Sequence, residues 1–244
     1  MKKRKIVALY ESGAKGFQPL VEQVMQEMFK IYPELNENYE IISNIYGIEK
    51  KKGANFSPNE LIHSGKLQNE KLDAERVLNA VALCGADFLA PPSFSQMYTF
   101  PRSKHLFLAV TSSDMVLRQG NGQSQRPCKG LASLDTALVV SGYGLQNKPE
   151  EFKTLLMRKM ATLLGMTGTK LHPECDAPNC ILHTKDNLPQ LTQKRLKLEQ
   201  EGYLPFCEEC IEKGRTQLKK LFEQDRKSYE RFEKMRKMRK IETK

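Results

Sequence analysis

Hydrophobic and polar positions follow two different rhythms along the chain, one typical of buried strands and one typical of helices. Short aliphatic runs predict four strand regions, at residues 5–10, 39–48, 105–112 and 131–141. Apolar residues spaced three and four apart predict helices at residues 17–32, 72–83 and 149–164. Because strand and helix patterns alternate, we expect an α/β domain.

The helical pattern at residues 149–164 is the strongest and predicts a helix of the core. Pro149 suits the first turn of a helix, where its missing N–H needs no partner. Glu150 and Glu151 complement the positive end of the helix dipole. The apolar residues form a broad stripe, made by Phe152, Leu155, Leu156, Met160, Leu163 and Leu164.

The ends of the helix at 72–83 and the neighbouring segments are interpreted from residue type. Asp73 is the candidate N-cap of this helix, and Gly85 is the candidate residue beyond its C-terminus. The stretch before it, up to about Lys71, is polar. Residues 120–130 are rich in Gly and Gln and predict a loop.

The length and the start of the chain suggest one large domain in a reducing compartment. The chain has 244 residues and no run of 18 or more apolar residues, so we expect no membrane span. The apolar run at residues 6–10 is too short for the core of a signal peptide, which predicts a cytoplasmic protein. In the cytoplasm, clustered cysteines bind metal ions more often than they form disulfides.

The positive charge of the chain is concentrated in its last segment. Residues 211–244 contain thirteen Lys or Arg and six Asp or Glu, a net charge of +7 out of +10. We therefore divide the chain into a domain at 1–210 and a basic amphipathic helix at 211–244 that extends it. One face of this helix carries Ile211, Leu218, Phe222, Tyr229 and Phe232. Nucleic acid or an anionic surface is a candidate weak partner of this tail, but we favour a solvated helix face.

Four of the six cysteines form two close pairs. Cys175 and Cys180 are five positions apart, Cys207 and Cys210 form a CxxC, and 26 residues separate the pairs. A tetrahedral zinc site takes two ligands from each of two tight turns, so this spacing predicts one structural Zn²⁺ held by all four thiolates. The alternative, four unrelated free cysteines, is disfavoured because the two pairs reinforce each other.

The remaining two cysteines do not fit this pattern. Cys84 lies on a helical apolar pattern, which predicts a small hydrophobic residue of the core. Cys128 lies in the polar loop predicted at 120–130, where we expect it to take no part in metal binding.

A core helix, then "LHPECDAPNCIL" at 171–182, then "FCEEC" at 206–210 resembles the archaemetzincins. These are zinc metalloproteases of the metzincin clan, with HExxHxxGxxHC, then four residues, Cys, any residue and Met, and later FCxxC. Upstream, "HLFLAVTSSDM" is similar to the family's strand ending in GVTDxD. The resemblance implies a twisted mixed, mostly parallel sheet with packed helices. It also implies a C-terminal segment stapled by structural zinc and leading into the basic helix.

The family's catalytic motif is replaced in this chain. With Gly165 aligned to the family's glycine, the first zinc-binding His becomes Arg158, the general-base Glu becomes Lys159, and the second His becomes Thr162. The third His would fall at Gly168, and the later Met becomes Leu182. Catalytic zinc needs three neutral nitrogen or anionic ligands, whereas two cations here would repel it.

The resemblance and its departures together imply a catalytically inactive protein, a pseudoprotease that binds a protein or peptide partner. The alternative is a zinc-dependent metallopeptidase whose site is rebuilt from His172, His183 and Glu174. A nucleic-acid binder resembling a zinc ribbon is a third option, permitted by a pI near 9.2 but lacking a basic recognition helix. The number of zinc ions per chain separates the first two.

Overall fold

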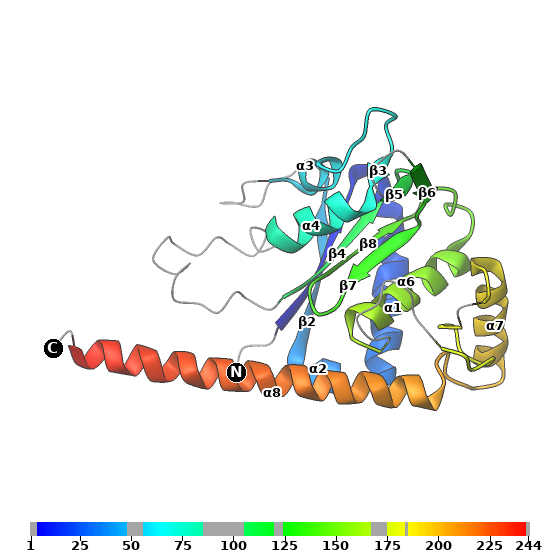
Figure 1. Ribbon diagram of the computed structural model, residues 1–244. Helices are drawn as coiled ribbons and strands as arrows, with labels where there is room; N and C mark the ends of the chain where they lie inside the picture. Colours follow the sequence, from blue (N-terminus) through cyan, green and yellow to red (C-terminus); the bar gives the residue numbers. More distant parts are fainter. Residues whose placement is uncertain are drawn as a thin grey trace.

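A five-stranded sheet forms the centre of the protein. The computed structural model describes residues 4–47, 56–84, 105–119, 124–166, 175–183 and 185–242. The strand order is β2-β1-β4-β8-β7 (Figure 1). The strands are β1 (Arg4–Tyr10), β2 (Tyr39–Tyr46), β4 (Leu106–Thr111), β7 (Gly130–Ser133) and β8 (Ala137–Ser141). All neighbours pair in parallel except β7, which runs antiparallel to β8 at the edge. The expected mixed, mostly parallel sheet is confirmed.

The three predicted helices are present with small shifts of their ends. They are α1 (Gln18–Ile31), α4 (Ala74–Cys84) and α6 (Pro149–Leu163). A short 3-10 helix, η1 (Ser12–Phe17), precedes α1. Asp73 caps α4 as predicted, since its Oδ1 accepts hydrogen bonds from the backbone N–H groups of Glu75 (3.1 Å) and Arg76 (3.3 Å). Ile48, the predicted end of β2, and Gly85, the candidate residue beyond the C-terminus of α4, lie outside the described residues.

The start of α4 is two residues later than predicted, because the preceding residues join a second sheet. This three-stranded sheet has the order β3-β5-β6 and contains β3 (Leu72–Asp73), β5 (Met115–Gln119) and β6 (Ser124–Pro127). The loop predicted at 120–130 is therefore wrong at Ser124–Pro127. All four residues of β6 are exposed, so the strand lacks the hydrophobic alternation that identifies most strands.

Further helices were not predicted from the sequence, although two of them begin with a recognisable N-terminal cap. They are α2 (Glu34–Asn38), α3 (Pro58–His63) and α7 (Leu188–Gln200). Ser57 and Glu60 form a capping box at the start of α3, and Asn187 and Gln190 form one at the start of α7. Because α3 is short and α7 is strongly polar, the capping box identifies each helix more clearly than the spacing of its apolar residues does.

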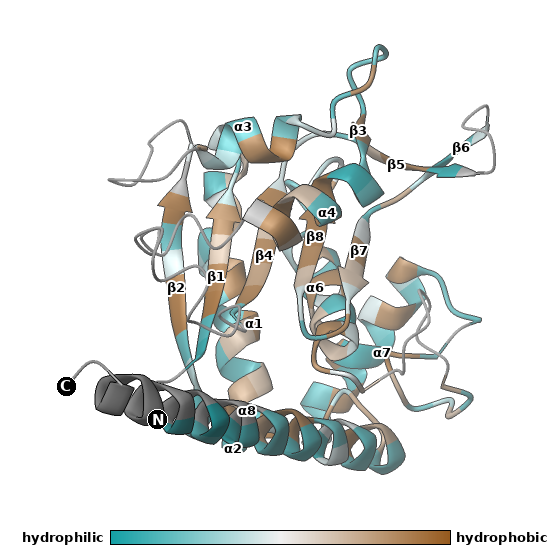
Figure 2. Ribbon diagram, turned by 60° about the vertical axis from the view of Figure 1, so that its left-hand side comes forward, coloured by the Kyte–Doolittle hydropathy of each residue, from teal (hydrophilic) through white to brown (hydrophobic). Residues whose placement is uncertain are grey.

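The central sheet is buried on both faces, which gives the protein a three-layer architecture. Ile6, Ala8 and Tyr10 of β1 belong to a core shared with α1, α6 and the start of the C-terminal helix. Val7 and Leu9 point the other way, into a core shared with α3 and α4. Figure 2 shows the mostly apolar colour of β4 and β8. Parallel strands covered on both faces are hydrophobic throughout rather than alternating.

The C-terminal helix α8 (Glu208–Glu242) passes the end of the sheet at which β1 and β2 begin (Figure 1). Ile211, Leu218 and Leu221 are buried. The ring centroid of Phe222 lies 5.8 Å from that of Tyr39, the first residue of β2. The side chains of Tyr229 and Phe232, assigned to the same face from sequence, lie outside the described residues. No helix within the described residues has the length and apolar character needed to span a membrane.

Candidate metal centre

Two segments that are distant in sequence lie side by side and carry the four cysteines. Cys175 and Cys180 bracket a turn after α6, while Cys207 precedes α8 and Cys210 lies in its first turn. The backbone N–H of Ile181 donates a hydrogen bond to the carbonyl of Pro205 at 3.0 Å. This bond holds the two segments side by side, so that the two cysteine pairs face each other.

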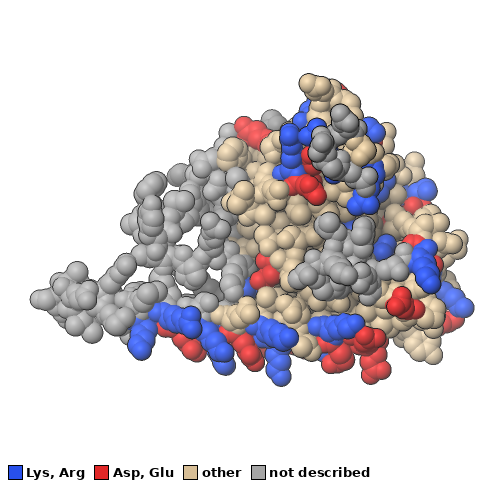
Figure 3. Space-filling view, in the orientation of Figure 1, with Lys and Arg blue, Asp and Glu red and all other residues tan. Residues whose placement is uncertain are grey.

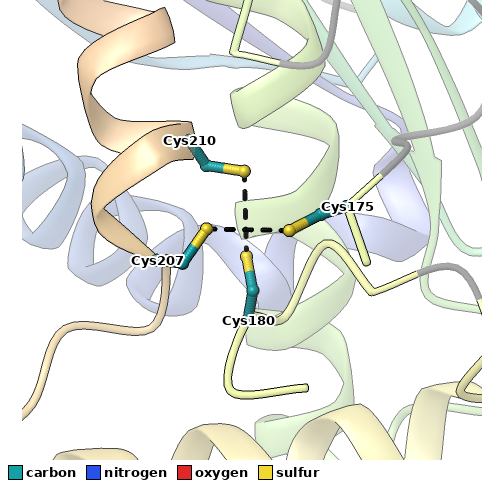
Figure 4. A group of neighbouring side chains, drawn as sticks. All are labelled: Cys175, Cys180, Cys207 and Cys210. Atoms are coloured by element: carbon teal, nitrogen blue, oxygen red, sulfur yellow. Dashed lines mark hydrogen bonds between the residues drawn. The ribbon is translucent and has the colours of Figure 1, made fainter. Parts of the chain in front are cut away.

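The four sulfur atoms have the spacing of a tetrahedral metal site (Figure 4). All lie within 4.8 Å of one another, with 3.6 Å between Cys175 and Cys207 and 4.0 Å between Cys180 and Cys210. Metal–sulfur bonds of about 2.3 Å place the sulfurs of a regular tetrahedron about 3.8 Å apart. The four cysteines are free of disulfides. The structure therefore brings together every predicted ligand in a geometry that can hold a metal ion.

The thiols interact strongly and share their protons. Contact with the Cys210 thiol, together with N–H groups including that of Leu182 (3.5 Å), lowers the pKa of Cys180 to about 5. The reciprocal contact raises the pKa of Cys210. Burial raises the pKa of Cys175 to about 11. A divalent cation would replace the shared protons and stabilise all four thiolates at once.

The helix α6 carries Arg158, Lys159 and Thr162, the three residues that the sequence resemblance aligns with the archaemetzincin catalytic motif. Burial lowers the pKa of Arg158, although the negative charges of Cys180 and Asp186 favour its protonated form. Burial and the charge of Arg158 lower the pKa of Lys159 to about 8. Thr162 is buried, and its hydroxyl donates to the Arg158 carbonyl at 3.3 Å. These side chains offer a divalent cation no carboxylate, imidazole or thiolate ligand.

Each histidine among the described residues has its own hydrogen-bond partner, and these histidines do not converge on one point. His63 Nε2 lies 2.6 Å from Glu11 Oε1, and His105 Nδ1 accepts a hydrogen bond from the Lys5 N–H at 2.9 Å. His183 Nδ1 lies 3.0 Å from Asp186 Oδ2. Within the described residues, the four cysteines are the one group of side chains placed to hold a metal ion. His172 and Glu174, the other candidates for a rebuilt site, lie outside those residues.

The environment of Cys128 differs from the sequence interpretation. It lies between β6 and β7, is buried, and belongs to the core shared with α4 rather than to a polar loop. Its thiol donates to the Gly130 carbonyl at 3.5 Å, and burial raises its pKa. The surrounding residues are polar, but pairing of β6 with β5 folds Cys128 onto the apolar face of the sheet. The side chain of Cys84 lies outside the described residues.

Sequence reasoning did not identify Tyr32 as a neighbour of the cysteines. This residue ends α1 and is fully buried, and the Cys210 and Cys180 thiols act on its hydroxyl electrostatically. Because the contact depends on how α1 packs against α8, no spacing in the sequence could have indicated it.

Comparison of the chain with models of known protein families and with curated proteins gave no match. The interpretation of the site therefore depends on its residues and geometry.

Proposed function

We propose that this protein is a catalytically inactive relative of the archaemetzincins, which keeps one structural Zn²⁺ and acts by binding a protein or peptide. One juxtaposition supports this proposal above all others. The helix α6 carries Arg158, Lys159 and Thr162 where the family pattern has His, Glu and His, while the cysteines of the later family motif converge beside it. The mixed, mostly parallel sheet agrees with the fold that the resemblance implies.

Zinc is the metal that these ligands fit best. Four thiolates in a tetrahedron are typical of structural zinc and leave no open position for a water molecule. Bound there, zinc would cross-link the turn after α6 to the first turn of α8. Structural zinc contributes roughly 10–16 kcal/mol in small peptide domains, where it creates the fold. This chain has its own extensive core, so its zinc would stabilise the two cysteine segments locally.

The residues of α6 are unsuited to metal-dependent hydrolysis at neutral pH. A general base must accept a proton from the attacking water, but Lys159, with a pKa of about 8, is mostly protonated at pH 7. Its charge and that of Arg158 also oppose binding of a divalent cation at this face of α6. Binding of a polypeptide requires neither a base nor a metal in this position.

The metal content of purified protein tests the proposal directly. We expect one tightly held zinc per chain by elemental analysis. Two zinc ions per chain would favour the metallopeptidase with ligands rebuilt from His172, His183 and Glu174, and no zinc would overturn the structural site.

A peptidase assay is the second test. We expect no cleavage of a peptide library at pH 7 above background, with or without added zinc. Cleavage that a chelator abolishes, and that survives rigorous removal of contaminating proteases, would contradict the inactive assignment.

The proposal also includes a weak, salt-sensitive contact between the basic helix and anionic polymers or surfaces. Acidic side chains alternate with the basic ones along α8 (Figure 3), which dilutes its positive field. A chain shortened after residue 224 should lose any binding to duplex DNA seen at low salt. Equal DNA binding by the shortened and full chains would exclude the tail as the contact.

A further inference from the structure

Two buried hydrogen-bond donors next to the four cysteines have no acceptor within the described part of the chain. They are the hydroxyl of Tyr32 and the Nε–H of Arg158. Buried donors are nearly always hydrogen-bonded in native proteins, so a donor without a partner indicates a contact that forms in another state of the site. Tyr32 directly follows α1 and Arg158 lies in α6, and thiols of the four-cysteine cluster act electrostatically on both residues.

Tyr32 approaches the cluster from the end of α1. Its ring is fully buried, and its hydroxyl lies against Gly214, where a Cβ atom would be 2.7 Å from the oxygen. Gly214 follows Cys210 by one helical turn, so the hydroxyl lies on the side of α8 that carries Cys210. A tyrosine hydroxyl keeps its proton at neutral pH, so this buried group is available as a hydrogen-bond donor.

Arg158 approaches the cluster from α6. The groups whose negative charge favours its protonated form are Cys180 and Asp186. Asp186 is already engaged, because its Oδ2 lies 3.0 Å from His183 Nδ1 and 2.5 Å from Lys194 Nζ. Cys180 is fully buried, and the partners that act on its thiol are other cysteine thiols and backbone N–H groups.

We infer that Tyr32 and Arg158 donate hydrogen bonds to the Cys210 and Cys180 thiolates when the cluster holds a metal ion, and thereby strengthen metal binding. Four thiolates and one divalent cation carry a net charge of −2, and this charge is buried beside the two donors. A neutral thiol is a weak acceptor, whereas a metal-bound thiolate accepts well. The inference rests on the proposed metal site and gives Arg158 a role: it supplies counter-charge where the family pattern has a metal-binding His.

Metal affinity measured by competition with a chromophoric zinc chelator tests this inference. Groups that hydrogen-bond to metal ligands typically contribute about 10–100-fold to affinity. We expect Tyr32→Phe and Arg158→Met to weaken zinc binding by about this factor, and Arg158→Lys, which keeps the charge, to weaken it less. Tyr10→Phe and Lys159→Met are matched controls: Tyr10 is another buried tyrosine of the same core, and the thiol that acts on Lys159 is Cys128. We expect them to change affinity less than about threefold.

The absorption spectrum of the Co²⁺-loaded protein provides a readout that a loss of packing would not reproduce. A hydrogen bond stabilises the sulfur lone pairs, so removing it should move the sulfur-to-cobalt charge-transfer band to lower energy. We expect this shift in Tyr32→Phe and Arg158→Met and not in the controls. If wild-type protein binds metal but both test variants match the controls in affinity and spectrum, this inference is wrong and the metal site stands. If wild-type protein binds no metal, the proposed site and the inference both fall.

Discussion

Tyr32, which directly follows α1, and Gly214 of α8 pack so closely that a Cβ atom on Gly214 would lie 2.7 Å from the Tyr32 hydroxyl oxygen. The same Cβ would lie 2.7 Å from Cγ of Met166, which follows α6. Three segments therefore meet at this glycine, one helical turn after Cys210. The position requires a glycine because of this close approach rather than because of its backbone angles.

Replacing Gly214 by alanine should destabilise the protein by about 1–2 kcal/mol. Alanine favours a helix over glycine by up to about 1 kcal/mol, but overpacking a well-filled core typically costs about 1–3 kcal/mol. Urea unfolding measures the difference. Gly16→Ala is the control, since a Cβ there meets nothing within 4 Å. A stabilised Gly214→Ala protein would show that the three segments can move apart without cost.

Replacing Cys207 and Cys210 together by serine should release the metal and loosen the start of α8, while the sheet remains folded. Two of four ligands are lost, but the core around β1 and β4 has no need of the metal. Hydrogen exchange should increase at Ile181 and across residues 211–222, and stay unchanged in the strands.

The matched control for these serine substitutions is Cys128→Ala. Cys128 is buried in the core shared with α4 and is not one of the four clustered cysteines, so this variant should keep its full metal content. The ligand assignment would be wrong if the Cys207→Ser, Cys210→Ser protein retained all of its zinc and exchanged like wild type.

Glu11 is a buried carboxylate that directly follows β1, at the carboxyl end of the parallel strands. Burial by itself raises the pKa of Glu11, but hydrogen bonds outweigh it and lower the pKa from its ordinary 4.5 to about 2. Its partners are Thr111 Oγ1 (2.6 Å), His63 Nε2 (2.6 Å), Ser112 N (2.7 Å), Ser113 Oγ (2.9 Å) and Ser112 Oγ (3.0 Å). They join the ends of β1 and β4 to α3.

The lowered pKa of Glu11 predicts a specific loss of stability in acid. A group whose pKa is lower in the folded state stabilises the protein above its unfolded pKa, and this contribution disappears as the pH falls towards the folded pKa. A shift from 4.5 to about 2 corresponds to roughly 3 kcal/mol, lost between about pH 4.5 and pH 2. Glu11→Gln should therefore be less stable at pH 7, with the difference from wild type shrinking in acid.

Urea unfolding of both proteins across that pH range measures the effect. Glu22→Gln is the control, because Glu22 also accepts side-chain hydrogen bonds, from Ser43 and Gln18, but lies near the surface. A gap between Glu11→Gln and wild type that does not depend on pH would mean that lost packing, and not the charge, causes the destabilisation.

Arg195 anchors α7 to α6 from a fully buried position. Its Nε donates to Thr154 Oγ1 at 2.9 Å, and its terminal nitrogens pair with the carboxylates of Glu150 and Glu199. Arg195→Met should destabilise the protein by about 2–4 kcal/mol, because it removes one partner of a buried network. Arg215→Met, which breaks an exposed pair with Glu212, should change stability by less than about 1 kcal/mol. Thermal unfolding of the two variants compares them, and equal effects would refute the anchoring role.

The strands and core helices could be predicted because their signals are local. A buried parallel strand such as β4 is hydrophobic along almost its whole length, and α6 repeats its apolar residues every three or four positions. The two cysteine pairs were recognisable for the same reason, since each pair lies within one turn. Among the elements that were missed, β6 and α3 are short, so their stability comes from neighbouring segments rather than from their own hydrophobic pattern.

The chain by itself thus determined the strand regions of the central sheet, the core helices, and the four thiols that are candidates for a metal site. Only the tertiary structure decided that β7 reverses direction at the edge of the sheet and that Cys128 is buried. It also decided that Tyr32 packs against Gly214, one helical turn after Cys210. Hydrophobic periodicity records that a face is buried, but not which segment buries it. Contacts between distant segments follow from how whole layers pack, and the surroundings of the cysteines consist of such contacts.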